Sequence, residues 1–369
     1  MFSDQPVPQA SPTVYVRRQT PRASPLLPVF WRFAAARQRA YLKRLAGEPA
    51  PWSEDAILRE YRFTNPYRAS DRVSQALIAL VYADPHVTDE DLFLRTLLFK
   101  FFNKIETWMH IVGTLGLPRA CSFQPASIER VLDNRKLGGA IYSAAYIMPS
   151  GGAGVPKHRM HLELIGKMLS DGLPAKIRAT KTRSEIYSLL LSYPTLGPFL
   201  AFQFSIDLGY TTLVSSEEDD FVVAGPGAID GISKCFESLG DYSPAETIMW
   251  LTRNQLDEFR HFEVEFDDLW GRHLQPIDVQ NLFCEVSKYT RVSNPEVRGS
   301  AGRTRIKQRF EPHGSLPAPF FPPKWGINEA VSAWWKAQPV AACRPDADLQ
   351  LRLTATRSVR DTPAAVAPG

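Results

Sequence analysis

Between residues 28 and 325 the spacing of apolar and polar residues is overwhelmingly that of helices. The clearest helix covers Leu92–Val112, where the apolar positions share one face: Leu94, Leu97, Leu98, Phe101, Ile105, Trp108 and Met109. Before it, Thr88-Asp89-Glu90-Asp91 offers a hydroxyl cap and an acidic first turn. We therefore predict one long helix here.

Two further helices flank a short turn. Ser184–Leu191 and Phe199–Leu208 are apolar runs, and the second is nearly unbroken, as in a buried helix. The segment Tyr193-Pro194-Thr195-Leu196-Gly197-Pro198 can continue neither helix, because proline removes a backbone donor and fixes φ. We predict a tight helix hairpin, with Phe199–Leu208 buried against the Leu92–Val112 helix.

The start of the second hairpin helix is a candidate anion site. Its first N–H groups lack acceptors within the helix, and the helix dipole favours negative charge there. Gly197 would let a phosphate approach the backbone closely. The alternative is an ordinary corner between two packed helices.

The later part of the chain continues the helical pattern. Ser243-Pro244-Ala245-Glu246 is a capping box with proline at the first helical position, and it predicts a helix to about Phe262. Ile277–Tyr289 has the pattern of another helix, and a basic loop, Arg291–Arg309, follows it. The pattern as a whole predicts an all-α fold.

Composition divides the chain into three parts. Residues 1–27 are rich in proline and arginine, which is typical of a disordered leader. Residues 28–325 form the helical domain, and residues 326–369 are expected to hold a short helix and a flexible tail rich in alanine and proline.

Charge and cysteine content narrow the class of protein. The net charge of +4 only weakly favours anionic partners. The four cysteines lie far apart and lack zinc-binding spacing. The sequence has neither an apolar run long enough to span a membrane nor a signal-peptide core at its start. We therefore expect a cytoplasmic protein that does not enter a membrane.

A glycine loop is the best phosphate-binding shape in the sequence. Gly152 and Gly154 precede a predicted helix that begins near Lys157 and His158, so the loop could wrap an anion that these two side chains neutralise. Its spacing is not that of a P-loop, and an ordinary surface loop is the alternative. His158 and His161, three residues apart, form no convincing metal triad, so we expect no metal site except Mg²⁺ accompanying a nucleotide.

Three polar groups interrupt the apolar pattern. The first is a stretch with planar donors and an aromatic ring, suited either to DNA or to buried hydrogen bonds between helices: Arg62, Asn65, Tyr67, Arg68 and Arg72. The second is the acidic run Glu217–Asp220, where Asp219 or Asp220 could act as a base or lie solvated in a loop. The third is a helix face that fits either a cleft or an ion-pair network: Asn281, Glu285 and Lys288.

Two resemblances bear on function. Pro194–Ala201 resembles the hairpin of helix-hairpin-helix DNA glycosylases, although Thr195 stands where that family has its first glycine and the turn contains no lysine. Asp219 and Asp220 fall where those enzymes place a catalytic aspartate. The resemblance implies that the hairpin contacts DNA through Gly197.

A second resemblance runs from about Pro28 to Trp325. It rests on separated motifs: Phe30–Phe33, Tyr61–Val73, Leu98–Lys100, Asn103–Trp108, Asp278–Asn281 and Cys284–Tyr289. Together these resemble the helical domain of 5-hydroxymethyl-deoxyuridine (5-hmdU) DNA kinases. That domain belongs with the alpha-glutamyl/putrescinyl thymine pyrophosphorylases, a glycosylase-like group linked to thymine hypermodification in phage DNA.

This second resemblance implies a DNA-modifying enzyme. The reaction would be phosphoryl or pyrophosphoryl transfer to the hydroxymethyl group of 5-hydroxymethyluracil in DNA, with ATP and Mg²⁺ as cofactors. The acidic run and the Asn281–Lys288 face are predicted to line one cleft, in which a carboxylate accepts a proton and a lysine holds a phosphate. A base-excising glycosylase and a non-catalytic DNA-binding module are the alternatives.

Overall fold

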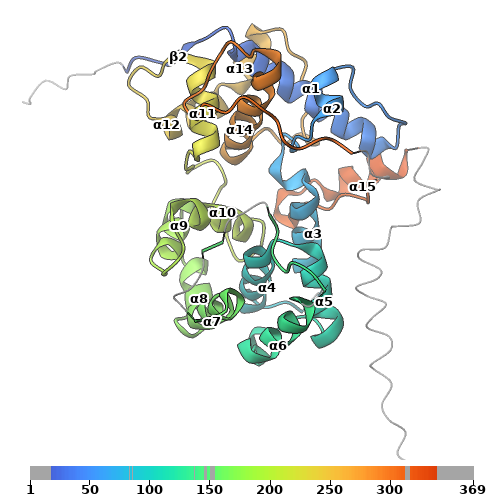
Figure 1. Cartoon of the computed structure of the whole chain (residues 1–369), viewed down its shortest axis with the longest axis vertical. Helices are drawn as coiled ribbons and strands as arrows, with labels where there is room; N and C mark the ends of the chain where they lie inside the picture. Colours follow the sequence, from blue (N-terminus) through green and yellow to red (C-terminus); the bar gives the residue numbers. More distant parts are fainter. Residues whose placement is uncertain are drawn as a thin grey trace, which may run out of the picture.

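The computed structural model describes residues 18–82, 84, 86–136, 138–144, 148–149, 154–311 and 316–338. Helices make up most of the regular structure of these residues, and their two named strands form a small antiparallel sheet. The predicted all-α class is confirmed. The helices gather into two lobes, each with its own hydrophobic core (Figure 1).

The middle lobe is formed by the central part of the sequence. Its helices are α3 (Arg72–Val81), α4 (Asp89–Phe102), α5 (Ile105–Leu115), α6 (Pro125–Lys136), α7 (Lys157–Ser170), α8 (Leu173–Arg178), α9 (Arg183–Leu191) and α10 (Pro198–Gly209), with a 3₁₀ turn, η2 (Ala120–Ser122). Helix α4 is buried from Asp91 to Phe102, because α3, α7, α8 and α10 surround it.

The terminal lobe combines both ends of the described chain. Its elements are β1 (Arg22–Ala23), α1 (Leu27–Ala46), α2 (Ala56–Glu60), α11 (Pro226–Cys235), β2 (Phe236–Ser238), α12 (Pro244–Arg253), α13 (Gln255–His261), α14 (Pro276–Ser293), η3 (Pro323–Trp325) and α15 (Asn328–Lys336). Helices α11 and α14 lie closest together, since Gly231 of α11 leaves room for the backbone of Phe283. The turn η1 (Arg68–Ser70) leads from this lobe into α3.

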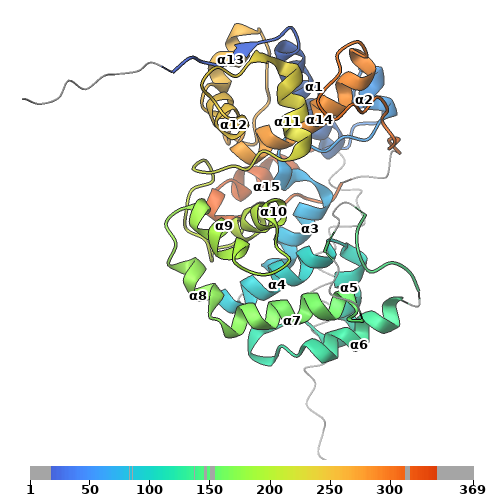
Figure 2. The same cartoon turned by 60° about the vertical axis from the view of Figure 1, so that its left-hand side comes forward.

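Helix α10 lies between the two cores, at the top of the middle lobe in both views (Figure 1 and Figure 2). Leu200, Ala201, Phe204 and Leu208 belong to the core of the middle lobe, whereas Phe202 and Ile206 belong to the core of the terminal lobe. This double contact explains why the α10 sequence is apolar on nearly every side. The predicted packing of this helix on α4 is confirmed, with the rings of Phe204 and Phe101 5.0 Å apart.

Two predicted helices are broken in the structure. The long helix predicted over residues 92–112 is instead two helices, α4 and α5, because Asn103 takes a left-handed conformation (φ 48°) that ends α4 and Lys104 is extended. The capping box at Ser243 is confirmed, but the helix it begins ends at Arg253, and α13 follows after Asn254.

The ends of the described chain are partly ordered. Arg22 lies in β1 and Arg18 forms a 2.9 Å ion pair with Glu246, so residues 18–27 of the expected leader pack on the terminal lobe. The short helix expected after residue 326 is α15. The rest of the expected leader and tail, residues 1–17 and 339–369, lies outside the described residues. Within the described part, no helix has both the length and the apolar character that crossing a bilayer requires.

Candidate functional site

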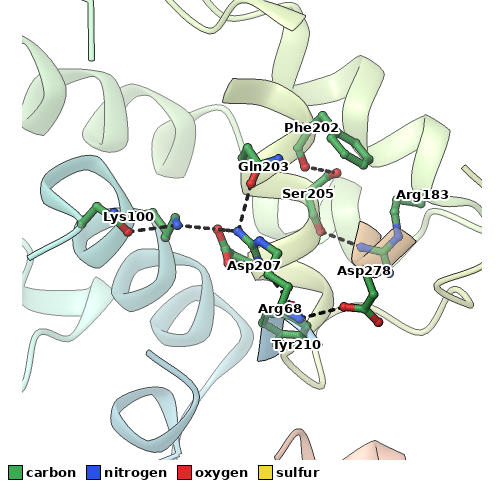
Figure 3. Close-up of polar contacts among 10 residues, drawn as sticks. Arg68, Lys100, Arg183, Phe202, Gln203, Ser205, Asp207, Tyr210 and Asp278 are labelled. Atoms are coloured by element: carbon green, nitrogen blue, oxygen red, sulfur yellow. Dashed lines mark hydrogen bonds and ion pairs between the residues drawn. The ribbon is translucent and has the colours of Figure 1, made fainter. Parts of the chain in front are cut away.

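A buried ionic cluster joins the two lobes at α10 (Figure 3). Arg68 donates to both carboxylate oxygens of Asp207, with Nη1–Oδ1 at 2.8 Å and Nη2–Oδ2 at 3.0 Å. Lys100 of α4 places Nζ 3.1 Å from the same carboxylate. Gln203 and Tyr210 accept further hydrogen bonds from Arg68, both at 3.2 Å. All five residues are at least 95% buried.

The spacing of α10 explains the cluster. Gln203, Asp207 and Tyr210 lie four and three residues apart, so their side chains share one face. Burial alone would raise the pKa of Asp207, but the charges of Arg68 and Lys100 hold it below its ordinary value. The carboxylate is therefore ionised and fully engaged, which makes the cluster a joint between the lobes.

Asp278 connects this joint to the start of α14. Its Oδ1 accepts the backbone N–H of Arg68 at 2.8 Å, and its Oδ2 accepts that of Gln275 at 2.9 Å, as part of a capping box. Burial raises the pKa of Asp278 to about 7, although these two N–H groups work in the opposite direction. The hydrogen bond from Arg68 therefore holds the first turn of α14 against η1.

The sequence analysis singles out Arg68 but not its partners in this joint. Asp207 and Gln203 lie within the apolar run of α10, and Lys100 enters only through a motif. The available signal was a charged residue placed where all its neighbours are apolar, as Lys100 is in Leu97–Phe102. Such a residue is expected to be paired when it is buried.

The acidic run divides among three environments. Glu218 is buried, with a 3.0 Å ion pair to Arg272 and a 2.6 Å hydrogen bond from Trp325 Nε1. Asp220 is exposed and accepts the backbone N–H of Arg183, the first residue of α9, at 2.8 Å. Asp219 is exposed at the edge of a cavity of about 140 Å³. Of the two predicted catalytic aspartates, Asp219 is therefore the one that faces a cavity.

The cavity beside Asp219 lies where α12 meets the start of α14. Arg253 and His273 supply its ionisable groups besides Asp219, and Gln255, Gln275 and Pro276 form part of its wall. A carboxylate, an imidazole and a guanidinium are thus available to a small polar group in this cavity.

The predicted face of α14 forms hydrogen bonds with the polar stretch before η1 through Glu285 and Lys288. Lys288 and Glu285 form a 2.7 Å ion pair, Glu285 accepts the N–H of Thr64 at 3.1 Å, and Lys288 donates to the carbonyl of Arg62 at 2.8 Å. Asn281 is half-buried on the same helix. Lys288 lies about 18 Å along α14 from Pro276, so the structure does not bring it to the cavity beside Asp219.

The predicted DNA-binding stretch separates into buried and exposed residues. Asn65 and Tyr67 are buried, and their side chains bond the carbonyls of Ser70 and Arg272, at 2.8 and 2.7 Å. Arg68 belongs to the joint. These three residues thus make the buried hydrogen bonds that were the alternative to DNA contact. Arg62 and Arg72 are exposed, and Arg72 pairs with Glu106 at 3.2 Å.

The hairpin turn between α9 and α10 exposes Pro194, Thr195, Gly197 and Pro198, while Tyr193 and Leu196 are buried. Thr195 has φ +71°, a left-handed conformation that is unfavourable for a β-branched residue, so it keeps a glycine-like backbone where the glycosylases have glycine. Gly197 has φ −71°, and a Cβ placed on it would meet no heavy atom within 4 Å. Phe199 is 41% exposed, unlike the remainder of the predicted buried helix.

The predicted nucleotide loop is described only in part. Gly152 lies outside the described residues, and Gly154 has φ +94°, a conformation suited to glycine. Lys157 and His158 begin α7 and line a cavity of about 450 Å³ together with Lys136. Lys157 Nζ lies 4.6 Å from the centre of the Tyr142 ring, and burial lowers the pKa of this lysine.

Comparison with known proteins identifies the family. Residues 24–299 match the family described as "5-hmdU DNA kinase, helical domain". The chain belongs to this family. A curated relative, the 5-hmdU DNA kinase of Bacillus phage SP10, is 23% identical over 300 residues, which cover 75% of this chain and 46% of the relative. The chain therefore spans about half the length of that relative. No solved structure matches it.

Proposed function

We propose that this chain binds DNA containing 5-hydroxymethyluracil and serves in phosphoryl or pyrophosphoryl transfer to the hydroxymethyl group, with ATP and Mg²⁺. The observation that carries the proposal is the family match over residues 24–299. The relative's name describes a kinase of 5-hmdU in DNA. Because the relative is about twice as long as the matched region, the part played by this chain within the reaction has to be tested directly.

The hairpin turn is the proposed contact with the DNA backbone. Gly197 needs neither a left-handed conformation nor internal space, so the fold itself does not require glycine there. A glycine is explained if a phosphate approaches the uncapped N-terminus of α10 from outside. The exposed ring of Phe199, in the first turn of α10, could then stack on an unpaired base.

A second proposed contact is the basic segment beside Arg62. The backbone N–H of Arg62 bonds the carbonyl of Gln308, so residues 62 and 308 lie side by side. The exposed cations on this segment include Arg303, Arg305 and Lys307, whereas the exposed Arg309 is paired with Glu60. Together with the exposed Arg62 they offer charge to successive phosphates, and this contribution is sensitive to salt.

For the chemistry, Asp219 is the proposed acceptor of the hydroxyl proton, because it lines a cavity. The transferred phosphate is proposed to lie in this same cavity, where Arg253 supplies positive charge, because the cavity with Lys136 and Lys157 lies between α6 and α7 at the far end of the middle lobe (Figure 2) and a phosphate there would not reach a hydroxyl beside Asp219. Asp220 is proposed to act indirectly by holding the start of α9, and Glu285 and Lys288 by holding the polar stretch before η1.

The deciding experiment incubates the purified chain with ATP, Mg²⁺ and DNA containing 5-hydroxymethyluracil, and then analyses the digested nucleosides by mass spectrometry. A phosphorylated nucleoside that is absent with unmodified thymine DNA supports transfer by this chain. If the nucleosides are unchanged but the chain binds the DNA, the chain serves in recognition alone. If the chain neither modifies nor binds the DNA, the proposal is contradicted.

Base excision is a second candidate, favoured by the Asp219 carboxylate at the edge of a cavity. A carboxylate there could stabilise the positive charge that develops on a sugar when its base departs. Release of free base, followed by strand cleavage after alkaline treatment, would identify this activity. The same digest distinguishes it from transfer, because the modified nucleoside would disappear without gaining a phosphate.

A further inference from the structure

Three potential metal ligands come together between α6 and α7, far apart in the sequence. Glu129 and Asp133 lie four residues apart on α6, so they share one helix face. His158 lies in the first turn of α7, which packs against α6. One ligand atom from each side chain lies within 4.8 Å of the other two.

The orientation of His158 points to an ion. Its side chain is 99% buried, and Nε2 has no hydrogen-bond partner. Nε2 does lie 2.9 Å from Asp133 Oδ1, but the contact is not aligned for a hydrogen bond. A metal ion takes the in-plane lone pair of an imidazole nitrogen, so an ion could lie beside Asp133 without displacing it.

The separations fit an ion after the side chains move together. Two ligands on a tetrahedral Zn²⁺ lie about 3.4 Å apart, given zinc–ligand distances of about 2.1 Å. Nε2 of His158 and Oδ1 of Asp133 are already 2.9 Å apart, and the remaining separations, of up to 4.8 Å, have to contract by up to about 1.4 Å. Asp133 is free to move because its side chain is 54% exposed. Glu129 is also held by Arg159, whose Nε lies 2.6 Å from Oε1.

We propose that Glu129, Asp133 and His158 bind a divalent transition metal ion. One imidazole and two carboxylates suit Zn²⁺ or Mn²⁺ better than Mg²⁺, which favours oxygen ligands and retains its water. His158 also lines the cavity that contains Lys136 and Lys157, so the ion would border that cavity. The inference concerns metal binding alone and does not depend on the proposed reaction.

The test titrates the EDTA-treated full chain with Zn²⁺ by isothermal titration calorimetry, and repeats the titration with Mg²⁺. We expect saturable binding of one Zn²⁺ that Asp133→Asn or Glu129→Gln weakens at least tenfold, since each removes a ligand. Arg159→Ala should strengthen binding, because it releases Glu129 from its ion pair. Circular dichroism establishes that each variant is folded.

Glu163→Gln is the matched control, because Glu163 is an exposed carboxylate on α7 outside the cluster. It should bind Zn²⁺ as the wild type does. A wild-type chain that takes up no Zn²⁺ would overturn the proposal. So would equal affinities of the wild type, Asp133→Asn and Glu129→Gln, because the bound ion would then lie elsewhere.

Discussion

At the scale of single residues, the joint around Asp207 carries two cations and one carboxylate that contact each other out of water. Arg68 and Lys100 are each about 4% exposed, so neither can be solvated if the carboxylate is removed. A buried pair adds little net stability when it forms, but breaking one leaves an uncompensated charge. The same residues that connect the lobes are therefore the ones least tolerant of substitution.

Asp207→Asn should lower the free energy of unfolding by about 3–5 kcal/mol, because both cations lose their counter-charge while the shape is preserved. Urea denaturation measures this loss. Asp257→Asn is the control, since Asp257 pairs with Arg260 at the surface, where both side chains are at least 70% exposed. The control should change stability by less than about 1 kcal/mol. Equal effects of the two substitutions would show that the joint is solvated.

The raised pKa of Asp278 should appear in the pH dependence of stability. With a folded pKa of about 7 and an unfolded value of about 3.9, the folded chain binds more protons between these limits. The Asp278 contribution to stability is therefore present at low pH and is lost as pH rises toward 7. Burial of Asp71, whose pKa is raised to about 6, acts in the same direction.

We expect the stability difference between wild type and Asp278→Asn to favour the wild type most at pH 5 and to shrink by pH 8. Urea denaturation of both proteins at each pH measures this difference, and other titrating groups cancel in the comparison. A difference that grows with pH would mean that the Asp278 carboxylate is stabilised in its charged form.

At the scale of elements, close helix contacts depend on individual glycines. A Cβ on Gly231 would lie 2.1 Å from the carbonyl oxygen of Phe283, so α11 and α14 could not keep their separation. The hairpin shows the opposite case, because Gly197 has open space around it. Packing therefore explains the glycine at residue 231, whereas the packing around residue 197 leaves room for a larger side chain.

Gly231→Ala should destabilise the chain by about 1–3 kcal/mol or more, since backbone has to shift. Gly113→Ala is the matched control within α5, where a Cβ meets nothing within 4 Å. That change should stabilise the chain by up to about 1 kcal/mol, because alanine favours a helix. Thermal melts measure both, and a neutral Gly231→Ala would place α11 farther from α14 than the structure does.

At the scale of the whole molecule, two lobes meet along α10, and the hairpin turn leads directly into its first turn (Figure 2). The basic segment near Arg62 belongs to the terminal lobe, whereas the hairpin belongs to the middle lobe. If both contact DNA, the duplex is held by the two lobes together, and the buried joint fixes their relative position.

Gly197→Ala should leave the melting temperature unchanged and weaken DNA binding, because the added methyl group meets only an approaching ligand. Arg62→Ala should lower the slope of log affinity against log salt by about one. Fluorescence anisotropy at several salt concentrations measures both. Arg260→Ala, which removes an exposed arginine from α13, is the control. Wild-type affinity and slope in both test variants would exclude these two DNA contacts.

Most helices could be predicted from the sequence because their signals are local. The capping box at Ser243, the prolines around Gly197 and the apolar run of α10 act through residues at most a few positions apart. The breaks within two predicted helices could not be predicted, because the sequence signals are local. The left-handed Asn103, for example, leaves the apolar spacing on either side almost unchanged.

The sites depended on contacts between distant residues. Arg68 and Asp207 are 139 positions apart, and only the packing of α10 between two cores makes them partners. Packing likewise directed Asp219 to a cavity, assigned Asp220 to the start of α9, and brought His158 to two carboxylates of α6. The sequence by itself determined most of the helices and the family. The tertiary structure decided which polar groups are buried together, because burial and pairing are properties of the packed chain.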